Sequence, residues 1–439
     1  MSSFLTPSEM AIVAVWCSLP WVVKPLWGAV SDRCSCCGYR RRPYVSLSSL
    51  MAAASLATMP QYASSASRHA FVVCLFATSM ALCVCDVALD GSLMILVKWE
   101  NSENEGRSQT HSWMARVAGG CLASGWSGIL YQWGGLQAVC SICAAMCLAL
   151  SVAALDIPDD PVSQEKTPAS ASLGCSTLKS SLWRFVKRSS PVLLASIMVG
   201  LIPEVGTAQF FYLLSTNATP ISLSYIDLAG STASFLSLCA YSLLKPSHRC
   251  SFFLGVLLNA VSCLFGAMLT SDSVPWIVPV ACAEAVVGAA GGTLCLMPTI
   301  TILGRHAAKS RYESTLYSFG LSVLNGASVV SETVSATAMR NLHIARGSTD
   351  NIRRFVGVVA ALTFCLSPAA LLFPGGDHSG DRKRDRKSRT DPECVPLQSD
   401  IVSEASFSLT CSESSGEDEI VFDRGSDICD EMPSPLPSV

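Results

Sequence analysis

The stretch AFVVCLFATSMALCVCDVALDGSLMILV, residues 70–97, decides the fold class of this chain. Its only charged side chains are Asp86 and Asp90, and the other positions are apolar or small. A helix that crosses a bilayer needs about 20 mostly apolar residues, because the hydrocarbon core is about 30 Å thick. The stretch is therefore long enough to span a membrane as a helix, and it places two acids within the span.

The rest of the chain has the same character. Half of its 439 residues are hydrophobic and only 14% are charged, whereas soluble domains average about 25% charged residues. The mean hydropathy is +0.42. We expect an all-α polytopic membrane protein with about eleven transmembrane helices. The predicted spans are 9–30, 45–60, 70–97, 112–131, 133–155, 190–214, 221–244, 251–270, 274–303, 313–339 and 352–374.

Two polar segments divide the chain. Residues 156–189 form a predicted cytosolic linker, and residues 376–439 form a tail that begins basic and ends Ser-rich and acidic, which is typical of disorder. The linker separates an N-terminal bundle of five spans, 1–155, from a C-terminal bundle of six, 190–375. Because the halves of a transporter usually match, we expect one further helix to be encoded upstream; a protein of eleven spans is the alternative.

The positive charges predict the orientation. If the loop 31–44 faces the cytosol, most of the 30 Lys and Arg residues fall on the cytosolic side, together with the linker and the tail. We expect an integral protein of the plasma membrane, with an organelle membrane as the alternative, and no nucleic-acid partner. The 21 cysteines are scattered apart from Cys34, Cys36 and Cys37, so we predict neither a metal site nor a cofactor.

Ionisable residues inside the predicted spans are candidates for function, because each is costly in a bilayer. Asp86 and Asp90 share one helix face, and Lys24, Asp90 and Arg116 lie at similar depth, which favours mutual pairing. A purely structural charge network is an equally weighted alternative. Nearer the middle of their spans, Glu204 and Glu284 are candidates for carrying a coupling proton, although Glu204 could instead satisfy backbone groups beside Pro203.

The loop GAVSDRCSCCGYRRRPY, Gly28–Tyr44, resembles the signature loop of the major facilitator superfamily. In that resemblance Asp32, Arg33, Arg40 and Arg41 form a gating loop that latches two helices in one conformation. A plain anchor of positive charge is the alternative.

A closer resemblance is to the folate–biopterin transporter family. It rests on Pro20–Tyr44, the Asp86 and Asp90 phrase CDVALDG, Trp113 with Arg116 and the glycines after it, the phrase FFYLLSTN at 210–217, Met297-Pro298, Glu313–Thr315 and Asn325. The resemblance implies a two-bundle transporter that moves a folate or pterin by alternating access, with a small solute and the lipid bilayer as its partners.

Other functions stay open at this point. The charges would also suit another zwitterionic solute, such as an amino acid or an adenosyl compound. A receptor or scaffold that signals through the Ser-rich tail is a further alternative. An enzyme is not expected, because Asp86 and Asp90 share one helix face and cannot oppose each other across a substrate.

Overall fold

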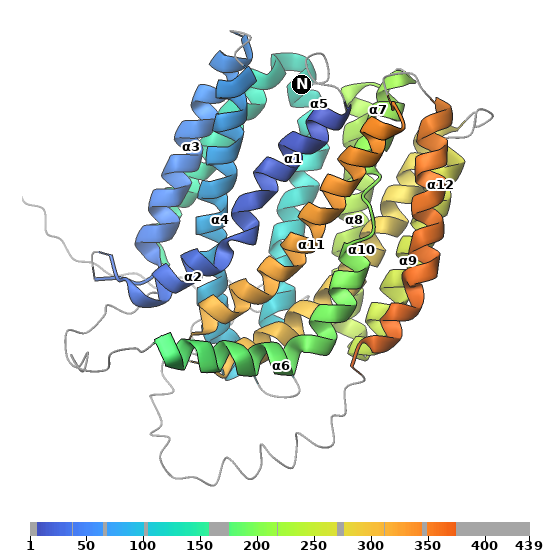
Figure 1. Cartoon of the computed structure of the whole chain (residues 1–439). Helices are drawn as coiled ribbons and strands as arrows, with labels where there is room; N and C mark the ends of the chain where they lie inside the picture. The colour runs from blue at the N-terminus through green and yellow to red at the C-terminus, as the bar shows by residue number, and fades with distance from the viewer. Residues whose placement is uncertain are drawn as a thin grey trace, which may run out of the picture. The chain divides into compact units, whose positions relative to one another are not determined.

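The computed structural model describes residues 7–36, 38–64, 68–100, 104–157, 175–216, 218–269, 276–310, 312–344 and 349–374. Within these ranges the regular elements are helices, which confirms the all-α fold class (Figure 1). They are α1 (Pro7–Val22), α2 (Lys24–Arg33), α3 (Arg42–Ser64), α4 (Arg68–Trp99), α5 (Arg107–Ala153), α6 (Cys175–Gly200), α7 (Gly206–Ser215), α8 (Pro220–Leu244), α9 (His248–Leu269), α10 (Ile277–Ala308), α11 (Glu313–Asn341) and α12 (Thr349–Leu366), with 3-10 turns η1 (Ala154–Asp156) and η2 (Ser367–Leu372).

Each predicted span coincides with helix, although three boundaries differ from expectation. The first span is broken into α1 and α2, and the sixth into α6 and α7. The fourth and fifth are the two arms of α5, separated at Gly135, whose φ of 62° is a left-handed value that glycine adopts readily. The second arm ends beside the start of α3, since Ser151 Oγ donates to the Ser46 carbonyl at 2.8 Å.

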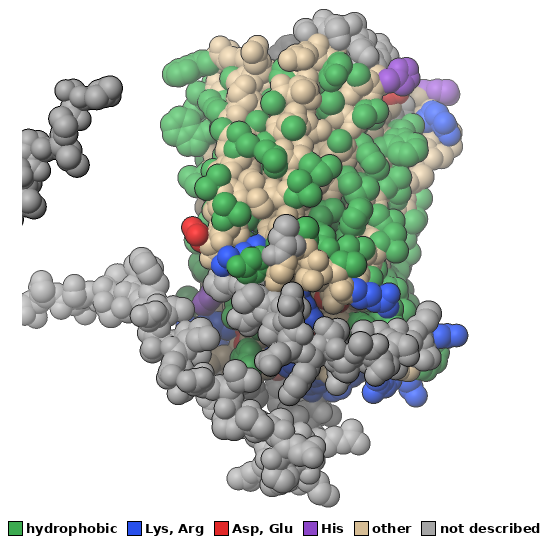
Figure 2. All heavy atoms as spheres, turned by 90° about the vertical axis from the view of Figure 1, so that its left-hand side faces the viewer, with side chains coloured by type: hydrophobic (Ala, Val, Ile, Leu, Met, Phe, Trp, Pro, Cys, Tyr) green, Lys and Arg blue, Asp and Glu red, His purple; other side chains and the backbone are tan. Residues whose placement is uncertain are grey.

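Length and hydropathy mark five helical segments as able to cross a membrane. They are Glu9–Arg33, His69–Trp99, Arg107–Asp156, His248–Leu269 and Ile277–Ala308. The outer face supports this reading, because large apolar side chains such as Trp133 and Leu243 are 86% and 82% exposed. Figure 2 shows hydrophobic side chains over the height of one face and Lys and Arg gathered near its lower edge.

Helix α6 was not expected in full. Its first turns lie within 175–189, which the sequence placed in the polar linker, while 158–174 and the tail 376–439 lie outside the described residues. Figure 1 shows this part of α6 lying across one end of the bundle. Leu182 and Phe185 turn inward and pack against α10 and α11, which stabilises a helix whose outer face is polar.

Proline has no N–H to donate, so a proline within a span frees the backbone carbonyl four residues earlier. At three of the prolines in the described helices, Pro25, Pro191 and Pro298, that carbonyl has a substitute donor. The Leu294 carbonyl, freed by Pro298, accepts from Ser251 Oγ at 2.9 Å, and the Lys187 carbonyl, freed by Pro191, accepts from Ser190 Oγ at 3.0 Å. The third, that of Trp21, belongs to the break between α1 and α2. Such replacement is what permits proline in a span without an unpaired backbone group.

The two halves of the chain meet mainly in two places. Helices α1 and α2 pack on α11, and the first arm of α5 packs on α8. At the second contact Gly128 lies so close to α8 that a β-carbon there would be 2.6 Å from the Ser224 β-carbon. Lys24 and Asp32 of α2 lie along the first contact, which therefore helps to position the candidate site.

Candidate functional site: a buried charge tetrad and a helix latch

Four of the predicted charged residues form one network, here called the tetrad: Lys24, Asp86, Asp90 and Arg116. Lys24 Nζ donates to Asp86 Oδ2 and lies 3.7 Å from Asp90 Oδ2. Arg116 bridges both acids, at 2.6 Å to Asp86 Oδ1 and 2.9 Å to Asp90 Oδ1. Two cations and two anions make the tetrad neutral, so that the attraction between them offsets the cost of removing each charge from water.

The tetrad has an enclosed side and an accessible side. The side chains of Lys24 and Asp90 are 3% and 4% exposed, whereas those of Asp86 and Arg116 are 13% and 34% exposed. Among the residues that the structure describes, none donates a hydrogen bond to Asp90 Oδ2. A solute that reached this site would therefore meet Asp86 and Arg116, with Lys24 and Asp90 behind them.

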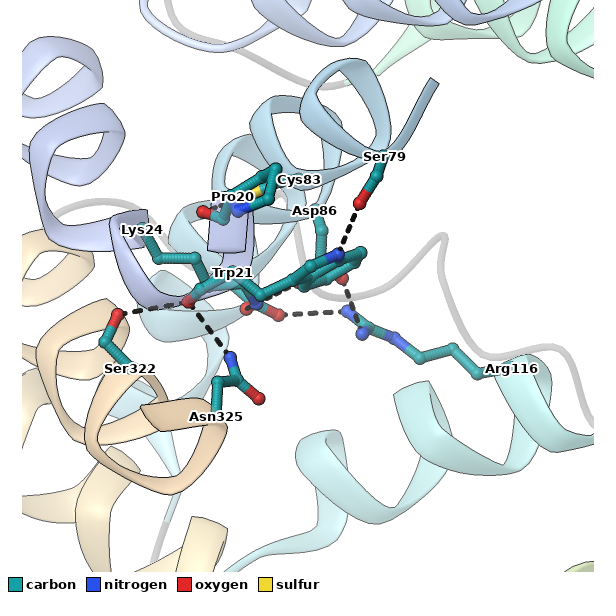
Figure 3. Close-up of polar contacts among 10 residues, drawn as sticks. Pro20, Trp21, Lys24, Ser79, Cys83, Asp86, Arg116, Ser322 and Asn325 are labelled. Atoms are coloured by element: carbon teal, nitrogen blue, oxygen red, sulfur yellow. Dashed lines mark hydrogen bonds and ion pairs between the residues drawn. The ribbon is translucent and has the colours of Figure 1, made fainter. Parts of the chain in front are cut away.

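Two tryptophans, which the sequence analysis did not select for this role, flank the cations. Lys24 Nζ lies 4.7 Å from the ring centre of Trp21, and the Arg116 guanidinium lies 5.2 Å from that of Trp113. Both distances are within the range of cation–π attraction. The indole N–H of Trp21 donates to Ser79 Oγ on α4 at 3.0 Å (Figure 3), so this ring is fixed between α1 and α4.

The break between α1 and α2 aims Lys24 at the acids. Pro25 cannot donate to the Trp21 carbonyl, and that oxygen instead accepts from Asn325 Nδ2 at 3.1 Å and Ser322 Oγ at 3.3 Å, both on α11 (Figure 3). Lys24 is the first residue of α2, directly after the break. Sequence reasoning had no means of finding these donors, because they lie some 300 residues away in the chain.

The predicted gating loop, which follows Lys24 in the chain, joins the two halves. Asp32 accepts from the backbone N–H of Thr315 at 2.9 Å and from its hydroxyl at 2.7 Å. Thr315 lies in the first turn of α11, so Asp32 supplies the cap that an N-terminal helix turn requires. Gly28 permits this close approach, because a β-carbon at that position would lie only 3.0 Å from the Thr315 Cα atom.

The other residues of the gating loop differ among themselves. Arg41 is 5% exposed, its Nη2 lies 3.8 Å from Glu313 Oε1, and its guanidinium covers Gly91 of α4. Arg33 and Arg40 are exposed. The structure thus places Asp32 and Arg41 between the halves, whereas Arg33 and Arg40 lie at the surface of the same end.

The two carboxylates predicted in the second half, Glu284 and Glu204, have contacts of their own outside the tetrad. Glu284 on α10 accepts from Gln209 on α7, and Gly266 on α9 leaves the space for this pair, since its β-carbon would be 2.7 Å from Glu284 Oε1. Glu204 lies exposed in the break between α6 and α7. A further acid, Glu332 on α11, accepts from Ser18 Oγ of α1 at 3.3 Å, and the sequence analysis did not select it.

A second ionic contact between the halves was also missed. Glu105, in the turn before α5, lies 2.9 Å from Arg305 of α10 and 3.8 Å from His248 of α9. Burial opposes ionisation of Glu105, but the interaction with His248 and the charge of Arg305 outweigh it and lower the pKa of the carboxyl below its usual 4.5. In sequence these residues looked like ordinary loop charges.

Known proteins resemble this chain over most of its length. The profile of the BT1 family matches residues 2–390. The folate-biopterin transporter of Synechocystis sp. is 25% identical over 404 residues, which cover 88% of this chain and 79% of that protein. Probable folate-biopterin transporter 2 of Arabidopsis thaliana is 24% identical over 257 residues, 55% of this chain and 49% of the plant protein.

These relatives are named as transporters, in agreement with the expectation that the chain is not an enzyme. The apolar helices agree with a protein integral to a membrane. Since the family profile covers most of the 439 residues, this integral membrane protein belongs to the BT1 family of transporters.

Proposed function

We propose that the chain is a secondary active transporter that moves a folate or pterin across a membrane by alternating access between two helix bundles of the major facilitator type. The observation that carries the proposal is the neutral tetrad, buried on one side and accessible on the other, in a chain whose relatives are named folate-biopterin transporters. The plasma membrane is the proposed location.

The chemistry of the accessible side suits this cargo. A pterin ring presents an N–H and an amino group side by side, and a carboxylate such as Asp86 can accept both. A folate also carries an anionic glutamate tail, which suits the planar donors of Arg116. The Trp113 ring beside Arg116 adds an aromatic surface to the same side. In the proposal, Asp86 and Arg116 contact the solute, and Lys24 and Asp90 hold them in place.

Proton coupling is the second part of the proposal. No described residue donates a hydrogen bond to Asp90 Oδ2, and Lys24 Nζ is 3.7 Å away. An oxygen with a free lone pair can take a proton without first giving up another donor. Glu284 and Glu204 are further candidates for the proton in the second half. A carboxylate that is alternately protonated and ionised would make the chain a symporter.

The gating loop is proposed to hold one of the two conformations. Asp32 caps α11 across the boundary between the halves, and Arg41 pairs with Glu313 on the same helix. These contacts form only while that end is closed. The charge distribution of the sequence makes this the cytosolic end, so the conformation is proposed to be closed toward the cytosol.

Uptake into proteoliposomes tests the function. The purified chain is reconstituted and offered labelled pterins, folates, amino acids and adenosyl compounds, with and without a proton gradient. We expect saturable pterin or folate uptake that a gradient accelerates and that Arg116→Gln reduces at least tenfold. Uptake of another zwitterion alone would replace the cargo, and no uptake of any solute would favour a receptor or scaffold.

A further inference from the structure

The carbonyl of Trp21 links the tetrad to the opposite half of the molecule. Pro25 deprives it of its partner within the helix, and Asn325 and Ser322 of α11 donate to it instead, at 3.1 and 3.3 Å (Figure 3). A backbone carbonyl without a donor is strongly unfavourable away from water. The shape of the break in the first half therefore depends on contact with a helix of the second half.

The same residue organises the cation of the tetrad. The Trp21 ring lies 4.7 Å from Lys24 Nζ, and its indole N–H is tied to Ser79 of α4. Lys24 begins the helical segment that follows the break. A change in the backbone at Trp21 would therefore move the Lys24 amine relative to Asp86 and Asp90.

On the basis of the proposed alternating access, we propose that Asn325, assisted by Ser322, is a positioning residue that couples the tetrad to closure of the two halves. When α2 and α11 separate, the Trp21 carbonyl loses both donors and the break must rearrange. Lys24 then moves, and its pairing with the acids changes together with the gate. Asn325 thus acts through Trp21 and Lys24, without contact with the solute.

The test uses accessibility, which needs no solute. Ser318 lies one helical turn from both Thr315 and Ser322, on the face of α11 that contacts Asp32 and the Trp21 carbonyl, and it is 0% exposed in this closed conformation. Ser318→Cys should therefore react with a membrane-permeant maleimide only when the halves part. Peptide mass spectrometry measures that site separately from the native cysteines. Asn325→Leu keeps the side-chain size and removes the donor, and we expect it to raise the labelling rate several-fold. Ser322→Ala is the milder variant, with a smaller rise, and it serves if Asn325→Leu does not fold.

A second substitution separates coupling from general loosening. Pro25→Ala restores an N–H at position 25 and gives the Trp21 carbonyl its intrahelical donor. In that background Asn325→Leu should change labelling little. As a matched control, Thr333→Val removes a hydroxyl that donates to the Val329 carbonyl of its own helix, and it should leave labelling unchanged.

Two outcomes would overturn the proposal. One is a labelling rate of Ser318→Cys that Asn325→Leu leaves unchanged. The other is a rise that is undiminished by Pro25→Ala, because the donor to Trp21 would then not be the cause. A wrong cargo assignment would appear in the uptake panel and would leave these labelling rates as they are.

Discussion

Neutralising Lys24 or Asp90 singly should destabilise the protein more than neutralising both. Asp90→Asn leaves Asp86 as one carboxylate between two cations, so one buried positive charge has no counterpart. Lys24→Met leaves Arg116 between two carboxylates. Removing one partner of a buried pair typically costs about 3–5 kcal/mol. We expect the lower half of this range for Lys24→Met, because Arg116 still contacts both acids.

The double variant returns the site to neutrality. Lys24→Met with Asp90→Asn leaves Arg116 and Asp86 as a complete ion pair at 2.6 Å. Its cost should fall to about 1 kcal/mol, the typical effect of a single substitution. As a control, Lys98→Met removes an exposed lysine at the end of α4 and should stay within about 0.5 kcal/mol of wild type.

The assay is the order of unfolding temperatures in detergent, followed with a thiol-reactive dye, since unfolding of such proteins is often irreversible. The expected order is wild type and Lys98→Met, then the double variant, then both singles. If the double variant unfolds at no higher temperature than the less stable of the two single variants, the reasoning about charge balance is refuted. Uptake then assigns the role: folding without uptake in the double variant identifies a group that contacts solute or proton, and recovered uptake identifies a structural one.

Three further outcomes are expected. Gly28→Leu should open the contact with Thr315 and abolish uptake while the protein still reaches the membrane. Gly119→Ala should be silent in the same uptake assay, because no described atom beyond the neighbouring turns of its own helix lies within 4 Å of a β-carbon there. The pKa of Glu105 is lowered, so its pairing with Arg305 stabilises the fold above pH 4.5 and is lost as the pH falls through the depressed pKa; the difference in unfolding temperature between wild type and Glu105→Gln should vanish there. Finally, protease added outside intact cells should not cut the linker between the halves, and cleavage there would reverse the assigned orientation.

The spans were predictable because a bilayer imposes length and composition on each helix separately. Residues 70–97 reveal a span without reference to any other part of the chain. Similar depth also sufficed to suggest that Lys24, Asp90 and Arg116 meet. Charged side chains at one depth in an apolar bundle have few other charged groups with which to pair. The structure brings them together with Asp86.

What sequence could not supply were contacts that depend on the packing of distant helices. The donors to the Trp21 carbonyl are an ordinary Asn and an ordinary Ser on α11, and nothing in their local sequence marks them. The cap that Asp32 provides is likewise visible only once α2 lies against α11. The first turns of α6 were read as linker because their polar face dominated the composition, although Phe185 is buried on the other face.

Helix α11 serves two interrupted helices at once. Besides the Trp21 carbonyl at the first break, the Ile202 carbonyl at the second break accepts from Ser331 Oγ at 2.6 Å. At about 100° of rotation per residue, Ser331 projects about 180° from Ser322, so the two breaks flank opposite sides of one rod. Rotating the rod about its own axis would release both carbonyls together. Tilting α11 would instead withdraw the donors from one break and press Ser331 or Ser322 closer to the other. A tilting motion of α11 would therefore free the two carbonyls alternately.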